Sequence, residues 1–79
     1  MIYCIIYDYD KENVKQLAGD FLEWNVPAKD RKEVIEIAKR RLKRYGYSYA
    51  TIFTLDSNGV TILAIVDNAG KVEEEPGDV

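Results

Sequence analysis

The spacing of hydrophobic and polar positions changes several times along this 79-residue chain. Residues 2–7 are continuously apolar and rich in β-branched and aromatic side chains, which predicts a strand covered on at least one face. Residues 11–23 then show the three-and-four spacing of a helix, with Asp10 as its N-cap. The predicted apolar stripe of this helix is Val14, Leu17, Ala18, Phe21 and Leu22.

A second helix is predicted from its end signals. Asp30 followed three residues later by Glu33 has the layout of a capping box, with aspartate in the usual Ser or Thr position. Gly46 is suited to the left-handed conformation that closes a helix. The apolar stripe between these ends consists of Val34, Ile35, Ala38, Leu42 and Tyr45.

The last third of the chain has the alternation and turn residues of a β-meander. We expect strands over residues 47–55 and 60–66, joined by a hairpin turn at Asn58-Gly59, because this pair tolerates the positive φ angles of a type I′ turn. A second turn over residues 67–70 leads into a short edge strand at 71–74.

The resulting order of elements is strand, helix, helix, strand, strand and a short final strand. We therefore expect a small single α+β domain, with the helices packed on one face of a mainly antiparallel sheet. The domain should comprise residues 1–72. Residues 73–79 form an acidic segment with proline and glycine, which predicts a flexible tail.

Both faces of the predicted hairpin are apolar. The Asn58-Gly59 turn places Ile52, Leu63 and Ile65 on one face. Tyr49, Thr51, Phe53 and Leu55 then share the other face with Val60, Ile62, Ala64 and Val66. Two short helices cover only one face, and monomers rarely expose a contiguous apolar patch of several hundred Å². The uncovered face is therefore expected to form a homodimer or to dock on another protein.

Tyrosines occur in two groups at every-other-residue spacing, which is the spacing of side chains on one face of a strand. The groups are Tyr3, Tyr7 and Tyr9, and Tyr45, Tyr47 and Tyr49. Tyrosine combines a large apolar ring with a hydroxyl that needs a partner, so it is frequent at protein interfaces. We therefore expect Tyr3, Tyr7 and Tyr9 to contact a partner, together with Ile52, Leu63 and Ile65.

Composition narrows the classes of function. The chain has no histidine and a single cysteine, Cys4, so a His–Cys metal site and a Ser–His or Cys–His catalytic pair are not expected. No glycine-rich phosphate loop is present. No apolar run approaches the length of a membrane span, and the first residues lack the features of a signal peptide. We expect a cytoplasmic, non-enzymatic protein without cofactor or metal.

An Asp-x-Asp pair, Asp8 and Asp10, follows the first predicted strand. It resembles the opening motif of haloacid dehalogenase-type phosphatases, although Glu12 stands where that family has Thr or Val. The strand ending in Tyr7-Asp8 is also similar to the small CRISPR adaptation nucleases, a ferredoxin-like family, and this resemblance implies a metal-binding Asp8. A metal-dependent nuclease at Asp8 and Asp10 is accordingly a third hypothesis. Helix capping by either aspartate explains the same residues.

Basic residues are concentrated near the end of the second predicted helix: Lys39, Arg40, Arg41, Lys43 and Arg44. Such a group binds phosphates, and stacking of bases on tyrosine would complete an RNA- or single-strand-binding module. Basic residues are also favourable against the negative end of a helix dipole. The net charge of −3 is unlike that of a dedicated nucleic-acid binder.

The favoured functional hypothesis is a small protein-interaction module that occupies a surface of a larger protein. In its size, compact α+β pattern and acidic end, the chain resembles small inhibitory or accessory proteins of phages and mobile elements, including some anti-CRISPR proteins. Nucleic-acid binding through tyrosines and the basic helix end is the alternative.

Overall fold

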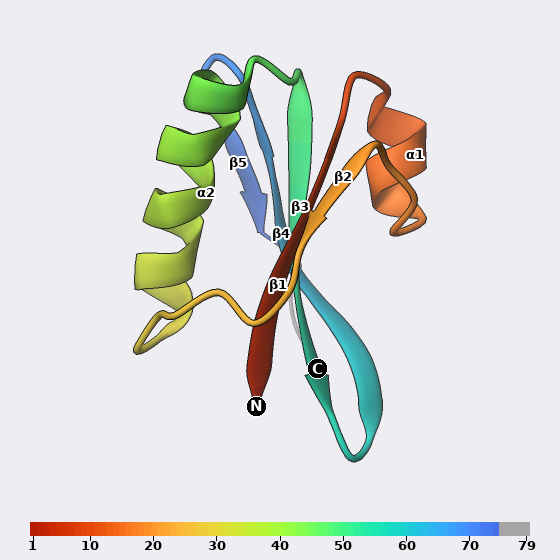
Figure 1. Ribbon diagram of the computed structural model, residues 1–79, viewed down its shortest axis with the longest axis vertical. Helices are drawn as coiled ribbons and strands as arrows, with labels where there is room; N and C mark the ends of the chain where they lie inside the picture. The colour runs from red at the N-terminus through yellow and green to blue at the C-terminus, as the bar shows by residue number, and fades with distance from the viewer. Residues whose placement is uncertain (75–79) are drawn as a thin grey trace.

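The computed structural model describes residues 1–74 of the chain, and within them it contains two helices and five strands (Figure 1). The α+β class and the single domain predicted from the sequence are confirmed. In chain order the elements are β1 (Ile2–Asp8), α1 (Lys11–Lys15), β2 (Phe21–Glu23), α2 (Arg31–Tyr45), β3 (Tyr49–Asp56), β4 (Gly59–Asp67) and β5 (Val72–Glu74).

The strands form one antiparallel sheet in the order β2-β1-β3-β4-β5. The two helices lie on opposite sides of this sheet, with α2 on one face and α1 on the other (Figure 1). The prediction that both helices share one face was wrong in this detail. Strand β2 separates them in sequence and lies at the sheet edge, where the chain can pass from one face to the other.

The first predicted helix is much shorter than its hydrophobic spacing indicated. Leu17 adopts a left-handed conformation, with φ of 58°, just beyond the last residue of α1. Gly19 then lies so close to β1 that a Cβ atom there would be 2.6 Å from the Tyr7 carbonyl oxygen. This close approach brings Phe21 and Leu22 into β2, where they pair with β1. Pairing with β1 therefore overrides the local helical pattern.

The predicted ends of α2 are confirmed. The Asp30 carboxylate accepts a hydrogen bond from the Glu33 backbone N–H at 2.9 Å, and Asp30 has extended backbone angles. The Glu33 carboxylate in turn accepts from the Lys29 backbone N–H. At the other end Gly46 is left-handed, with φ of 81°. These contacts satisfy backbone groups that a helix end leaves without partners.

The β3–β4 hairpin differs from the prediction in turn position and in register. Asp56 pairs with Gly59, so the two turn residues are Ser57 and Asn58 rather than Asn58 and Gly59. A β-bulge beside Ile52 then shifts the register of the ladder. Because one extra residue exchanges the two faces of a strand, Ile65 lies opposite Thr51 and not on the face of Ile52.

The sheet has an apolar cluster on each face. The larger one packs beneath α2 and includes Ile5, Tyr7, Ile52, Leu63, Val34, Ala38 and Leu42. The smaller one packs with α1 and consists of Cys4, Ile6, Val14, Phe53 and Ile65. The buried hydroxyl of Thr51 donates a 2.7 Å hydrogen bond to the Val14 carbonyl and so ties α1 to the sheet.

The predicted final strand is present as β5, an edge strand that pairs with β4. Glu73 and Glu74, which the predicted tail included, belong to this strand and make ion pairs with Lys11 and Arg31. The rest of the predicted tail, residues 75–79, lies outside the described residues.

No helix within residues 1–74 is long and apolar enough to cross a lipid bilayer.

Candidate functional site

Five aromatic side chains meet where β1, β2 and the end of α2 come together. The fully buried ring of Tyr7 is at the centre, with centroid distances of 5.7 Å to Phe21, 5.3 Å to Tyr45 and 5.9 Å to Tyr47. Tyr9 extends the group through Tyr47 at 4.9 Å. We call these five residues the aromatic cluster. Stacked and edge-to-face pairs at such distances are favourable beyond the area that they bury.

Carboxylates hold three of the phenol hydroxyls in place. Glu23, at the end of β2, accepts hydrogen bonds from the Tyr7 hydroxyl at 2.5 Å and the Tyr45 hydroxyl at 2.9 Å. The same carboxylate accepts from the Arg41 guanidinium at 3.0 Å. Asp20 accepts from the Tyr47 hydroxyl at 2.8 Å. These hydrogen bonds fix the orientation of the three rings.

The cluster shifts the acidity of its tyrosines. Burial, and then the hydrogen bond to Glu23, raises the pKa of Tyr7 far above its ordinary value. The hydrogen bond to Glu23 raises the pKa of Tyr45, and the hydrogen bond to Asp20 raises that of Tyr47. In each case the neutral phenol is the form that donates, so the carboxylate partner disfavours its ionisation. All three hydroxyls remain neutral donors at neutral pH.

Beside the cluster, β2 presents large apolar side chains to solvent. Phe21 and Leu22 are 40% and 47% exposed, and Trp24, just after the strand, is 59% exposed. Tyr45, in ring contact with Phe21 at 5.4 Å, is 38% exposed. We call these four residues the edge patch. They surround an edge strand, a part of the fold that most proteins protect with charge or with very short strands.

Most of the residues predicted to bind a partner are inside the fold. Tyr7, Ile52 and Leu63 are buried under α2, and Ile65 is buried in the cluster with α1. Their prediction as an exposed face was wrong, because the helices cover both faces and the bulge turns Ile65 away from Ile52. Of the predicted tyrosines, Tyr3 is partly buried against the larger cluster and only Tyr9 is largely exposed.

The second tyrosine group does not line one strand face. Tyr45 is the last residue of α2, Tyr47 precedes β3, and Tyr49 is its first residue. Tyr47 packs against the cluster beneath α2, whereas Tyr49 packs on the opposite side of the sheet. The prediction for this group was wrong because the helix continues to Tyr45, so its spacing is not that of a strand.

The five basic residues near the end of α2 point to different neighbours. Lys39 forms an ion pair with Glu36 at 3.3 Å, and Arg41 forms one at 3.0 Å with Glu23, whose carboxylate also binds the aromatic cluster. Within the described part of the chain, no side-chain hydrogen bond or ion pair is made by the remaining three, Arg40, Lys43 and Arg44. Lys39, Arg40 and Lys43 border one hollow, together with Asp67 and Gly70. Arg41 instead pairs with Glu23 of β2, so the five basic residues are not joined in one phosphate-binding surface.

The two aspartates after β1 have structural partners. Asp10 caps α1 by accepting from the Glu12 backbone N–H at 2.9 Å, as the sequence predicted. Asp8 accepts from the Asn13 side-chain amide at 2.8 Å, and this bond holds the pKa of Asp8 below its ordinary value. Among residues 1–74, no three metal-ligating side chains gather at one place.

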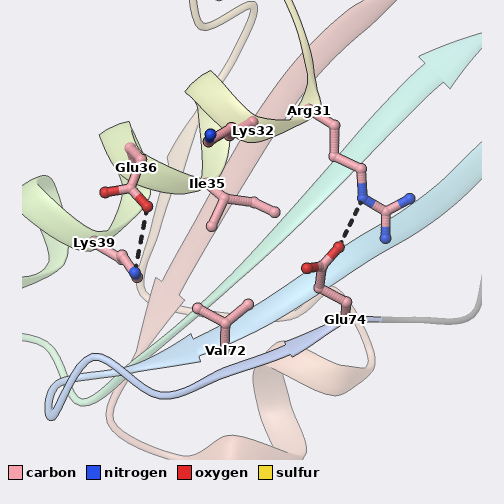
Figure 2. Close-up of a pocket in the computed structure, with 7 residues that line it drawn as sticks. All are labelled: Arg31, Lys32, Ile35, Glu36, Lys39, Val72 and Glu74. Atoms are coloured by element: carbon pink, nitrogen blue, oxygen red, sulfur yellow. Dashed lines mark hydrogen bonds and ion pairs between the residues drawn. The ribbon is translucent and has the colours of Figure 1, made fainter.

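A cavity of about 480 Å³ lies between α2 and the edge strand β5 (Figure 2). Its apolar part is made by Ile35 and Val72, which face each other across the gap in Figure 2. Charged side chains border it: Arg31 and Glu74 pair at 3.2 Å, and Lys39 and Glu36 pair at 3.3 Å, with Lys32 completing the lining. We call this cavity the α2–β5 groove.

Sequence reasoning missed both the edge patch and the α2–β5 groove. The helical spacing of residues 11–23 assigned Phe21 and Leu22 to a buried stripe, and Glu23 had no visible partner in sequence. The one available signal was Trp24, the single tryptophan, which follows an acidic residue and precedes an asparagine in a short polar connection. A large aromatic residue in such a connection is a candidate for an exposed binding residue.

Comparisons of the chain with protein-family models, with curated proteins and with solved structures find no significant match.

Proposed function

We propose that this chain is a small, non-enzymatic protein-interaction module of the cytoplasm, which binds a surface of a larger protein through the edge patch. One observation carries the proposal: four large apolar side chains, each between 38% and 59% exposed, lie along or beside one sheet edge, with Phe21 and Tyr45 on the α2 side of β2, Leu22 on the other side and Trp24 just after the strand. Exposed apolar groups gathered in this way are a mark of interaction sites, whereas scattered ones are ordinary. An inhibitory or accessory role is consistent with such a module.

The rigidity of the neighbouring aromatic cluster supports this function. Tyr45 is held by its hydrogen bond to Glu23 and by its ring contacts with Tyr7 and Phe21. A side chain that is already ordered loses little entropy when it is buried by a partner. Aromatic residues held in this way are typical of the residues that dominate binding energy at protein interfaces.

The charges around the cluster favour a protein over a nucleic acid as the partner. Glu23 and Asp20 accept from the tyrosine hydroxyls, and Asp8 and Asp10 flank the exposed ring of Tyr9 in the sequence. A phosphate backbone that followed the rings would approach these carboxylates and be repelled. Of the basic residues that would attract it, Lys39 and Arg41 pair with Glu36 and Glu23, and Arg40 and Lys43 lie beside Asp67.

Capture from a host lysate tests the proposal, with and without nuclease treatment. The test variant is Leu22→Ser combined with Trp24→Ala. The matched control is Val60→Ser, because Val60 is 50% exposed but lies in the β3–β4 hairpin, away from β2. We expect a protein partner that survives nuclease treatment, is retained by the control and is lost by the test variant.

With the captured partner purified, calorimetry should show that Trp24→Ala weakens binding about 30-fold, which corresponds to about 2 kcal/mol. Circular dichroism and sedimentation of each variant check that folding and self-association are unchanged. Capture that disappears with nuclease treatment, or that is equal for both variants, would contradict a protein-binding edge patch.

A further inference from the structure

The α2–β5 groove lies at the opposite edge of the sheet from the edge patch. Strand β5 ends the strand order at the edge far from β2, and α2 lies beside it across the α2–β5 groove (Figure 2). An extended peptide that adds to an edge strand next to a helix gains main-chain hydrogen bonds from the strand, and its alternate side chains enter the space beneath the helix. A volume of about 480 Å³ is within the range of ligand sites.

We propose that the α2–β5 groove binds an extended peptide with an apolar residue at its centre and an acidic residue two positions before and two positions after it. These three side chains would lie on the same face of the peptide strand. The peptide pairs with β5 as a sixth strand of the sheet. This inference goes beyond the proposed function and does not depend on the edge patch, because β2 and β5 are at opposite edges of the sheet.

The apolar requirement comes from the lining of the groove. Ile35 is on the groove-facing side of α2 and Val72 is on the adjacent face of β5. Val72 is opposite Val66 in the sheet and packs against the larger core cluster. Successive side chains of a strand point to opposite faces of the sheet. Every second side chain of a strand added outside β5 would therefore lie on the face of Val72, in the space between Val72 and Ile35. An apolar residue is the one that removes most water there.

The acidic requirement comes from the border of the groove. Three cations, Arg31, Lys32 and Lys39, face two carboxylates, Glu36 and Glu74, which leaves one net positive charge. Lys32 supplies this charge, since it makes no ion pair among the described residues, whereas Lys39 pairs with Glu36. The Lys39 pair is partly exposed, and exposed pairs are weak, so a peptide carboxylate can exchange for Glu36.

The spacing follows from the rise of the two elements. Lys32 and Lys39 are separated by about 10.5 Å along α2, at about 1.5 Å per residue. Residues on one face of a strand recur about every 7 Å, so residues four apart are separated by about 13 Å. Flexible lysine side chains bridge the remaining difference. Two acidic residues four positions apart, with an apolar residue between them, therefore match the groove.

The test uses the intact chain and a fluorescently labelled peptide with the core Glu-Thr-Val-Thr-Glu, followed by fluorescence anisotropy. A peptide with lysine in place of both glutamates should bind at least tenfold more weakly, because it meets like charge. Lys32→Glu should weaken binding of the acidic peptide by about fivefold or more. Lys43→Glu is the matched control, since it makes the same charge change on α2 outside the groove, and it should change affinity less than about twofold.

Backbone methylation separates strand addition from simple charge attraction. Alternate residues of an antiparallel strand direct their N–H groups to the same neighbour. Two peptides N-methylated at alternate nitrogens, in the two possible phases, should therefore differ: one should lose binding and the other should retain it. Amide chemical shifts should change at residues 72–74. The proposal would be overturned if no binding is seen at millimolar peptide, or if the two methylated peptides bind equally. It would also be overturned if Lys32→Glu and Lys43→Glu have equal effects, or if the chemical-shift changes are confined to residues 21–23.

Discussion

The hydroxyl of Tyr7 donates to the carboxylate of Glu23, and this bond joins the buried centre of the aromatic cluster to an edge strand of three residues. The same carboxylate reaches Tyr45 and Arg41 at the end of α2. Glu23 therefore links β1, β2 and α2 through one side chain that is only 15% exposed. The position of the edge patch depends on this link, because β2 is too short to be held by backbone pairing with β1 alone.

Replacement of Glu23 by alanine should destabilise the fold by about 1–3 kcal/mol, because the buried Tyr7 hydroxyl loses its acceptor. Urea unfolding followed by circular dichroism measures this change. Glu36→Ala is the matched control: its side chain is 53% exposed and, within residues 1–74, its ion-pair partner is Lys39, so the substitution should cost less than about 1 kcal/mol. Equal effects of the two substitutions would show that Glu23 does not link the elements.

Stability should fall as the pH rises above 10. The ordinary pKa of tyrosine is 10.0, and Tyr7 has a raised pKa in the folded chain. Below pH 10 both states hold the proton and the full stability is present. Above it the unfolded state releases the proton while the folded state retains it, so unfolding becomes more favourable until the folded pKa is passed.

This pH dependence can be measured by urea unfolding at several pH values between neutrality and pH 11, a range that spans the ordinary tyrosine pKa. Tyr7→Phe should be less stable at neutral pH, since Glu23 loses a donor, but its stability should fall less steeply above pH 10. Tyr45 and Tyr47, whose pKa values are also raised, should keep part of the slope. A slope identical to that of the unmodified chain would exclude Tyr7 as the cause.

Gly19→Ala should destabilise the chain by about 1–3 kcal/mol through overpacking. The new Cβ would be 2.6 Å from the Tyr7 carbonyl oxygen and 3.0 Å from a side-chain carbon of Ile6, so β1 or the α1–β2 connection must shift. Thermal unfolding provides the measurement. Gly46→Asn is the control, because this position has open space and asparagine tolerates its left-handed conformation. If Gly19→Ala is as stable as the original chain, the close approach is not a constraint on β2.

Thr51→Val should detach α1 from the sheet without unfolding the rest. The substitution removes the Thr51 hydroxyl donor, while the Val14 carbonyl keeps its bond from the Leu17 backbone N–H at 3.1 Å, so the cost should be about 0.5–1.5 kcal/mol. Amide hydrogen exchange should accelerate in residues 11–18 and remain slow in α2, which packs on the other face. Thr61→Val, at an exposed position of β4, should leave exchange unchanged. Faster exchange throughout both helices would contradict separate docking of α1.

The sequence by itself determined the elements whose signals are local. The N-cap at Asp30, the left-handed Gly46 and the apolar stripe between them define α2, because capping and helical spacing act within a few residues. The continuous apolar run of β1 and the turn residues of the β3–β4 hairpin likewise predicted strands in the right places. These elements were sufficient for the α+β class.

Only the tertiary structure decided which side chains are exposed. Phe21 and Leu22 satisfy a helical pattern, but Gly19 allows the chain to approach Tyr7 and pair as β2, and this pairing is a contact between segments far apart in sequence. The bulge beside Ile52 moved Ile65 to the other face, and no local residue signals it. Exposure depends on such nonlocal pairing and register, because a shift of one residue exchanges the two faces of a strand.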